Sequence, residues 1–226
     1  MAKTVSIAID GPAGAGQSTI ARRLAKELGY YYVDTGAIYR TVAYFLDLLG
    51  ISPKDVDGVE RYLDELTVKI EYDEEGKQHM LMNGMDVTDE IRTQDISQKA
   101  SLVSAHAIVR DMLLDMQRDV AKKHNVIMDG RDIGTVVLPR ATVKIFLTAS
   151  AEIRAKRRMD EMIAKGQKAN FEQVLKDIQQ RDFQDSNRPV APLKQAKDAV
   201  LLDTSDLDIE GVVTAMKDII GKKVAL

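Results

Sequence analysis

The 226-residue chain contains no cysteine, only three histidines and no long uninterrupted apolar run. The lack of cysteine excludes disulfide bonds and thiolate metal sites, and three histidines leave little material for an imidazole cluster. No apolar run approaches the length of a membrane span, and residues 1–4 lead directly into an apolar segment without a signal-peptide core. We therefore expect a cytoplasmic protein with no membrane partner.

An excess of charge of one sign is also missing. Charged residues make up 30% of the chain, but the formal net charge is only −3. Such a chain has no global basic field of the kind that marks a general nucleic-acid binder, so we expect no nucleic-acid partner. Internal repeats and low-complexity tracts are absent. The length has room for one α/β domain with a small insertion, and we expect a single domain over residues 1–226.

The chain is organised around a glycine-rich segment at residues 11–19, with the sequence GPAGAGQST. A β-branched, apolar segment at residues 5–9 precedes it, and Ile20, Leu24 and Leu28 follow at helical spacing. In such a strand, loop and helix, glycines let the backbone amides point inward and the helix adds the positive end of its dipole. The segment therefore predicts a phosphate-binding loop, or P-loop, and the alternative is a turn that binds nothing.

One position of this loop departs from the P-loop pattern. The pattern G-x-x-x-x-G-K-[ST] requires lysine at position 17, where this sequence has glutamine. Gln17 offers a neutral donor on a shorter stem, so it stabilises transition-state charge less well than lysine does. Three interpretations stay open: an engineered or accidental substitution in a working kinase, a natural variant with a compensating cation, and a pseudoenzyme.

Four more segments have the apolar character of buried strands, at residues 30–33, 126–129, 143–148 and 199–203. Helical periodicity separates these segments along the chain. Because crossovers between parallel strands are right-handed, this order predicts an α/β fold with a doubly wound five-stranded parallel sheet.

A change of pattern near residue 66 indicates an insertion. Residues 67–72 alternate between polar and apolar, residues 78–82 form a second such segment, and Asn83-Gly84 is typical of a tight hairpin turn before residues 85–87. We expect a small antiparallel three-stranded sheet, preceded by a short helix that Ser52 caps. The insertion serves substrate recognition or, alternatively, acts as a stabilising flap.

Polar side chains follow two of the predicted core strands. Thr35 and Arg40 come after residues 30–33, and Arg131 and Asp132 come after residues 126–129. Open α/β sheets bind ligands at the carboxyl ends of their strands, which favours a site there. In the alternative, Thr35 is a helix N-cap and Arg40 is a solvated side chain.

A basic helix is predicted at residues 151–165, with Arg154, Lys156, Arg157 and Arg158. Such a run is usually a solvated face, but beside a phosphoryl-transfer site it could close over a nucleotide. RNA binding by this helix is a third interpretation. A further amphipathic helix at residues 171–183 leads to a stretch that contains Arg181, Asp185 and Arg188.

Several motifs together resemble one family. They are the glycine-rich loop, DTGAIYR at 34–40, EIRT at 90–93, DGRDIGTVV at 129–137, the charged pattern at 181–188 and APL at 191–193. This set resembles the bacterial cytidylate kinases, which are P-loop nucleoside monophosphate kinases, over nearly the whole chain. No Asn-Lys-x-Asp segment for guanine recognition occurs. The resemblance implies a core at 1–65 and 106–226, a monophosphate-binding insertion at about 66–105 and a short helical lid at about 151–168.

The resemblance also implies an activity, namely transfer of the γ-phosphoryl group of ATP, with Mg²⁺, to CMP or dCMP. We expect a monomer with these partners; the alternative is a catalytically weakened nucleotide-binding module of the same fold. The implied ATP-binding residues are Gly11, Pro12, Ala13, Gly14, Ala15, Gly16, Gln17, Ser18 and Thr19, with Ser18 as the metal ligand.

The implied CMP-binding residues come from the other motifs. Thr35, Arg40 and Arg131, with Arg188, would hold the acceptor phosphate; Ser101, Arg110 and Asp132 would recognise cytosine; and Arg181 and Asp185 would contact the ribose. The implied catalytic residues are Gln17, Arg131, Arg154 and Arg158, of which Arg154 and Arg158 belong to the lid. No general base is implied, because the acceptor phosphate is already an anionic nucleophile.

Overall fold

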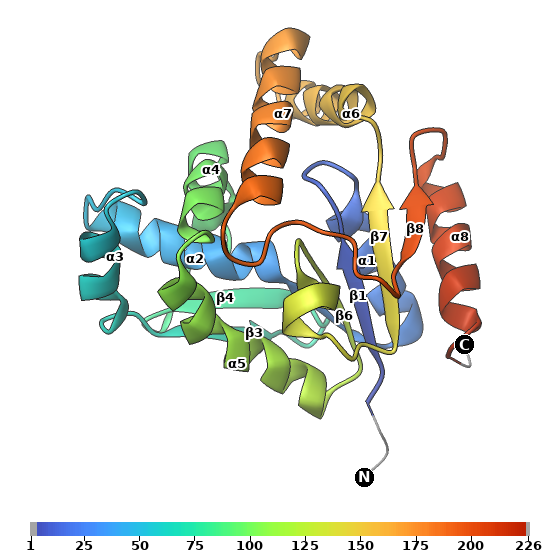
Figure 1. The fold of residues 1–226 in the computed structure, drawn as a ribbon, viewed down its shortest axis with the longest axis horizontal. Helices are drawn as coiled ribbons and strands as arrows, with labels where there is room; N and C mark the ends of the chain where they lie inside the picture. The colour runs from blue at the N-terminus through green and yellow to red at the C-terminus, as the bar shows by residue number, and fades with distance from the viewer. Residues whose placement is uncertain (1–3, 225–226) are drawn as a thin grey trace.

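The centre of the molecule is a five-stranded parallel sheet with the strand order β2-β6-β1-β7-β8 (Figure 1). The computed structural model describes residues 4–224. The strands are β1 (Ser6–Asp10), β2 (Tyr31–Asp34), β6 (Val126–Gly130), β7 (Val143–Thr148) and β8 (Val200–Asp203). This sheet confirms the predicted fold class. Residues 1–3, on which the expectation about a signal peptide partly depends, lie outside the described residues.

Strand register brings the carboxyl ends of three strands to the same level. Asp10 pairs with Gly130, and Asp34 pairs with Asp129, across the parallel ladders of β1, β6 and β2. Side chains that leave these ends therefore meet at one edge of the sheet, as the sequence pattern predicts.

Helices cover both faces of the sheet, because successive strand residues alternate between them. One face of the sheet carries Ile7, Ile9 and Ile127, whose side chains share a hydrophobic core with helices α1 (Gln17–Leu28) and α8 (Ile209–Gly221). The opposite face carries Ala8 and Met128, which belong to a second hydrophobic core. The helices on that side are α2 (Thr35–Leu48), α3 (Val56–Leu63), α4 (Gln94–Val103) and α5 (Ala107–Lys123). Within residues 4–224, no helix is both long and apolar enough to cross a bilayer.

The insertion contains the predicted three-stranded antiparallel sheet. Its strands are β3 (Val68–Tyr72), β4 (Gln78–Met82) and β5 (Met85–Asp86), and a short 3₁₀ helix, η1 (Glu90–Arg92), follows. Asn83 and Gly84 both have positive φ angles, 51° and 84°, as the hairpin turn requires. The division of the chain at about residues 66 and 105 stays a prediction.

The cap predicted for helix α3 is wrong. Asp55, not Ser52, caps the helix, and its carboxylate accepts a hydrogen bond from the Gly58 N–H at 3.1 Å. The hydroxyl of Ser52 accepts instead from the Lys54 N–H at 3.3 Å within the preceding turn. That turn, closed by a bond from the Asp55 N–H to the Ser52 carbonyl, delays the helix start.

Two side chains attach the insertion to the edge strand β2. The Gln78 amide accepts from the Asp34 N–H at 2.7 Å and donates to the Asp34 carbonyl at 3.3 Å. The Tyr72 hydroxyl donates to the Tyr32 carbonyl at 3.0 Å. These hydrogen bonds use the edge of β2 with which a further strand would pair. They fix the insertion beside the carboxyl end of β2.

Two helices, α6 (Ala151–Ala164) and α7 (Phe171–Asn187), lie beyond the carboxyl ends of the core strands (Figure 1). They pack on one another through a small cluster that includes Ala155, Val174 and Ile178. Helix α7 is longer than predicted and continues past residue 183. A π-helical turn, η2 (Ile133–Val137), follows β6.

Candidate active site

A cleft with a volume of about 740 Å³ opens at the carboxyl ends of β1, β2 and β6, between the glycine-rich loop and helices α4, α6 and α7. The predicted residues that line it are Ala13, Gly14, Gly16, Gln17, Ser18, Thr19, Thr35, Arg40, Ser101, Arg131, Asp132, Arg158, Arg181, Asp185 and Arg188. The cleft thus brings together most of the candidate residues. Gly11, Pro12, Ala15, Arg110 and Arg154 do not line it.

The glycine-rich loop packs tightly against its neighbours. A Cβ atom on Gly11 would lie 1.9 Å from the Leu147 carbonyl oxygen, so only glycine fits there. The Gln17 amide nitrogen donates to the Gly11 carbonyl at 3.2 Å and to the Gly130 carbonyl at 3.1 Å. The side chain is buried, and its amide therefore ties the loop to the end of β6.

Asp129 lines the cleft beside the loop. Its carboxylate accepts from the Ser18 hydroxyl at 2.8 Å and from the Tyr32 hydroxyl at 3.0 Å. Burial and, after it, the negative charge of Asp34 raise the pKa of Asp129 to about 7. Asp129 opens the motif at residues 129–137 but is not among the predicted site residues. The signal was available, because Asp129 ends a buried strand beside the other polar strand ends.

Asp34 organises the residues that follow β2. Its carboxylate accepts from the Ala37 N–H at 2.8 Å, which makes Asp34 the N-cap of α2, and it pairs with Arg40 at 2.9 Å. The alternative interpretation, in which Thr35 is the cap, is therefore wrong. Thr35 is the first helical residue, and its hydroxyl donates to the Asp129 carbonyl at 2.7 Å.

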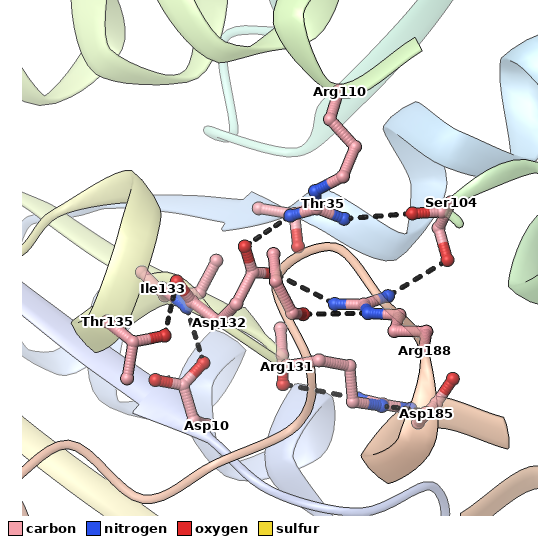
Figure 2. Close-up of polar contacts among 12 residues, drawn as sticks. Asp10, Thr35, Ser104, Arg110, Arg131, Asp132, Ile133, Thr135, Asp185 and Arg188 are labelled. Carbon is pink, nitrogen blue, oxygen red and sulfur yellow. Dashed lines mark hydrogen bonds and ion pairs between the residues drawn. The ribbon is translucent and has the colours of Figure 1, made fainter. Parts of the chain in front are cut away.

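Asp132 lies between two buried guanidinium groups (Figure 2). It pairs with Arg110 and, at 3.3 Å, with Arg188, and both arginines also bind Ser104, one at its carbonyl at 3.2 Å and the other at its hydroxyl at 3.0 Å. Burial and, after it, the nearby charge of Arg110 lower the pKa of Arg188. Sequence reasoning missed Ser104, because no pattern distinguishes a serine at the end of an amphipathic helix.

A second carboxylate, Asp185, joins helix α7 to the core. It accepts from the Arg131 Nε at 3.0 Å and from the Ser101 hydroxyl at 3.1 Å, and the Arg181 Nε lies 4.0 Å away. Burial raises the pKa of Asp185, but Arg131 and Arg181 outweigh it and the pKa is lowered. Burial and, after it, the charge of Arg131 lower the pKa of Arg181 to about 10.

The arginines of helix α6 have different environments. The Arg154 guanidinium donates to the Ala13 carbonyl at 3.0 Å and to both carboxylate oxygens of Asp182, at 3.0 and 2.6 Å, so it braces the glycine-rich loop from behind. Arg157 donates to the Thr204 carbonyl at 2.6 Å. The interpretation of this helix as a solvated basic face is therefore wrong for these two residues. Arg158 faces the cleft and pairs with Glu161 at 3.3 Å.

The geometry is that of a P-loop kinase, and comparison with known proteins decides which one. The family model "Cytidylate kinase" matches residues 7–222. The chain belongs to the cytidylate kinase family. As a member of this family it is a nucleoside monophosphate kinase, which confirms the resemblance inferred from the motifs.

Individual relatives match over almost their full length. A cytidylate kinase from Exiguobacterium sp. is 49% identical over 220 residues, which cover 97% of this chain and 98% of the relative. A cytidylate kinase from Carboxydothermus hydrogenoformans is 50% identical over 217 residues, which cover 96% of this chain and 97% of the relative. A crystal structure of an uncharacterized protein from Eubacterium ventriosum matches with a TM-score of 0.50 and 13% identity, covering 96% of this chain and 99% of that one, and supports the fold alone.

Proposed function

We propose that the chain transfers the γ-phosphoryl group of ATP to the 5′-phosphate of CMP or dCMP, giving CDP or dCDP. The observation that carries the proposal is the composition of the cleft in a cytidylate kinase family member. One wall is a phosphate-binding loop, and the other presents Arg131, Asp132 and Arg188 at the end of β6 and beside it.

The donor site is the glycine-rich loop with the start of α1. Backbone amides at a helix N-terminus bind phosphate groups without any side chain. The positions of Gly14, Gly16 and Thr19 on the cleft wall support this role, whereas Gly11, Pro12 and Ala15 lie behind and shape the loop.

The acceptor site lies across the cleft, where Thr35, Arg40 and Arg131 surround the carboxyl ends of β2 and β6. We assign the acceptor phosphate to these residues, assisted by Arg188. Asp132, with Arg110 and Ser101, would recognise cytosine, because an ionised carboxylate accepts a hydrogen bond from the exocyclic amino group that uracil lacks. Arg181 and Asp185 would contact the ribose. Two polyanions are thereby brought into line between guanidinium groups, which is the main requirement of phosphoryl transfer.

The residues around Ser18 fit a magnesium ion. Ser18 and Asp129 both line the cleft, and the Ser18 hydroxyl donates to the Asp129 carboxylate, so the two side chains offer an all-oxygen donor set of the kind that Mg²⁺ prefers. No group of three or more acidic or imidazole side chains forms a metal cage in residues 4–224. This agrees with an ion that substrate phosphates and water hold for the most part, and such an ion would neutralise phosphate charge.

Gln17 weakens the donor site in this proposal. Its amide nitrogen is bound to two backbone carbonyls and carries no charge. Loss of a charged contact to a desolvated anion costs about 2–5 kcal/mol, which corresponds to a loss of roughly tenfold to a few thousandfold in rate. Arg158 of helix α6 lines the cleft and is our candidate for a compensating cation, and we propose Arg158 and Arg131 as catalytic residues. Arg154, which does not line the cleft, would act by holding the glycine-rich loop through the Ala13 carbonyl.

A coupled assay of ADP formation tests the proposal with CMP, dCMP, UMP and AMP as acceptors. We expect turnover with CMP or dCMP, and we expect Gln17→Lys to raise kcat by at least tenfold. The control Gln195→Lys adds the same charge at an exposed site that does not line the cleft and should leave the rate within twofold.

The same assay decides the second candidate function, a nucleotide-binding module without turnover, which Gln17 itself favours. If Gln17→Lys phosphorylates neither CMP nor dCMP, the kinase proposal is wrong. If that variant nevertheless binds ATP and CMP in calorimetry, the binding-module function replaces it. If the parent chain instead has the same kcat as Gln17→Lys, then Gln17 does not impair turnover, and a compensating cation is indicated.

A further inference from the structure

Asp10 is a buried carboxylate that the proposed mechanism does not use. It ends β1, directly before the glycine-rich loop, and only 3% of its surface is exposed. It does not line the cleft. Its carboxylate accepts two short hydrogen bonds from backbone N–H groups, one from Ile133 at 2.6 Å and one from Gly134 at 2.7 Å. Figure 2 shows Asp10 beside the turn that carries Asp132.

These two N–H groups are the first of the π-helical turn η2, where no partner within the helix is available to them. Asp132 precedes the turn, and its carbonyl accepts from the Val136 N–H at 2.8 Å. The backbone of Asp132 is therefore held through Asp10, whereas its side chain is held by the buried arginines described above. The two sets of contacts have different roles. Asp10 fixes where the chain turns, and the arginines fix where the Asp132 carboxylate points.

The turn is tightly packed where it meets Asp10. A Cβ atom on Gly134 would lie 3.1 Å from the Lys144 Cδ and 3.2 Å from an Asp10 carboxylate oxygen. The Lys144 ammonium does not bind Asp10, since it donates to the Pro139 carbonyl at 2.7 Å and to Asp198 at 2.9 Å. The Asp10 carboxylate is thus held by the two N–H groups of η2, and burial raises its pKa to about 6.

We propose that Asp10 is a positioning residue for base selectivity, which fixes the cytosine-recognising Asp132 to the strand from which the ATP-binding loop begins. The inference rests on the proposed function, because it assumes that Asp132 recognises the base. It predicts that removal of the charge at Asp10 weakens discrimination between cytosine and uracil without weakening ATP binding. A purely structural role would instead affect the three nucleotides alike.

The test is calorimetric titration of CMP, UMP and ATP into the full chain and into Asp10→Asn at pH 7.5. Asparagine keeps the shape of the side chain but puts an NH2 group in place of one of the two accepting oxygens, so one buried N–H group loses its acceptor. We expect the Kd for CMP to rise at least tenfold, the ratio of the UMP and CMP values to fall by a similar factor, and the Kd for ATP to stay within twofold. The control Asp208→Asn changes an aspartate that accepts from the Gly211 N–H at 2.8 Å at the exposed start of α8, and it should move none of the three values.

Two further measurements keep the test decisive. In Asp10→Asn, the amide protons of Ile133 and Gly134 should exchange faster with solvent than in the parent. If Asp10→Asn does not fold, Gly134→Ala decides, because it crowds the same contact without removing the charge, and it should also lower the ratio of the UMP and CMP values.

The outcomes separate the two proposals. A folded Asp10→Asn, or Gly134→Ala in its place, that keeps the parent's ratio within twofold overturns the positioning role. A parent chain that binds CMP no better than UMP rejects the proposed function itself.

Discussion

The buried cluster around Asp132 allows a quantitative prediction that needs no nucleotide. Asp132 is 3% exposed and lies between Arg110 and Arg188, which are 6% and 9% exposed. Asp132→Asn preserves the shape but leaves two buried cations without their anion. Removal of one partner from a buried ion pair costs about 3–5 kcal/mol, and we expect the free energy of unfolding to fall by that amount. For a chain of this size, this corresponds to a decrease in Tm of roughly 6–20 °C.

Urea denaturation followed by far-UV circular dichroism, without nucleotide, measures this change. The control Glu210→Gln removes one partner of the exposed ion pair with Arg23 and should cause a much smaller loss. Addition of Arg110→Gln to Asp132→Asn should recover part of the loss, because it removes one of the two uncompensated cations. A loss below about 1 kcal/mol for Asp132→Asn would show that the cluster tolerates unpaired charge and would refute the reasoning.

Three further predictions concern other parts of the molecule. Asp182→Asn removes the anion that orients Arg154, and we expect calorimetry to give an ATP Kd several-fold higher with little change for CMP. Because Asp10 has its pKa raised to about 6, its stabilising contribution is complete below its ordinary pKa and is lost as the pH rises through 6; unfolding free energies should therefore show the parent losing about 3 kcal/mol relative to Asp10→Asn between pH 3.5 and 7. The hydrogen bond with Asp86 raises the pKa of His79, so its contribution is present below the usual histidine value and is lost as the pH rises through the raised one; NMR titration should show the raised pKa returning toward the ordinary range in Asp86→Asn.

The strands and the site's location could be predicted because they depend on local pattern. Alternation and apolar runs placed the strands to within a residue or two, and the parallel topology then brought residues that follow β2 and β6 to one edge. Thr35 and Arg131 were found in this way, since a polar residue after a buried strand is a strong signal.

The contacts that hold the site together could not be predicted, because they join residues far apart in the sequence. Ser18 and Asp129 are separated by 111 residues, and Arg154 and Ala13 by 141. The periodicity of a sequence gives no information about such pairs. The sequence of a helix does not distinguish a solvated basic residue from one that, like Arg154, is buried against a loop. Asp10 was missed for a related reason, since its partners are backbone groups that carry no sequence signature.

The attachment of the insertion through Gln78 and Tyr72 has a consequence for solubility. β2 is an outermost strand of the large sheet, and a bare outer strand offers unpaired N–H and C=O groups to a second molecule. Here the side chains of Gln78 and Tyr72 form hydrogen bonds with backbone groups of Asp34 and Tyr32 at that edge. A shortened chain from which the small sheet is deleted would therefore lose a protective cover as well as part of the cleft wall, and it should self-associate through β2.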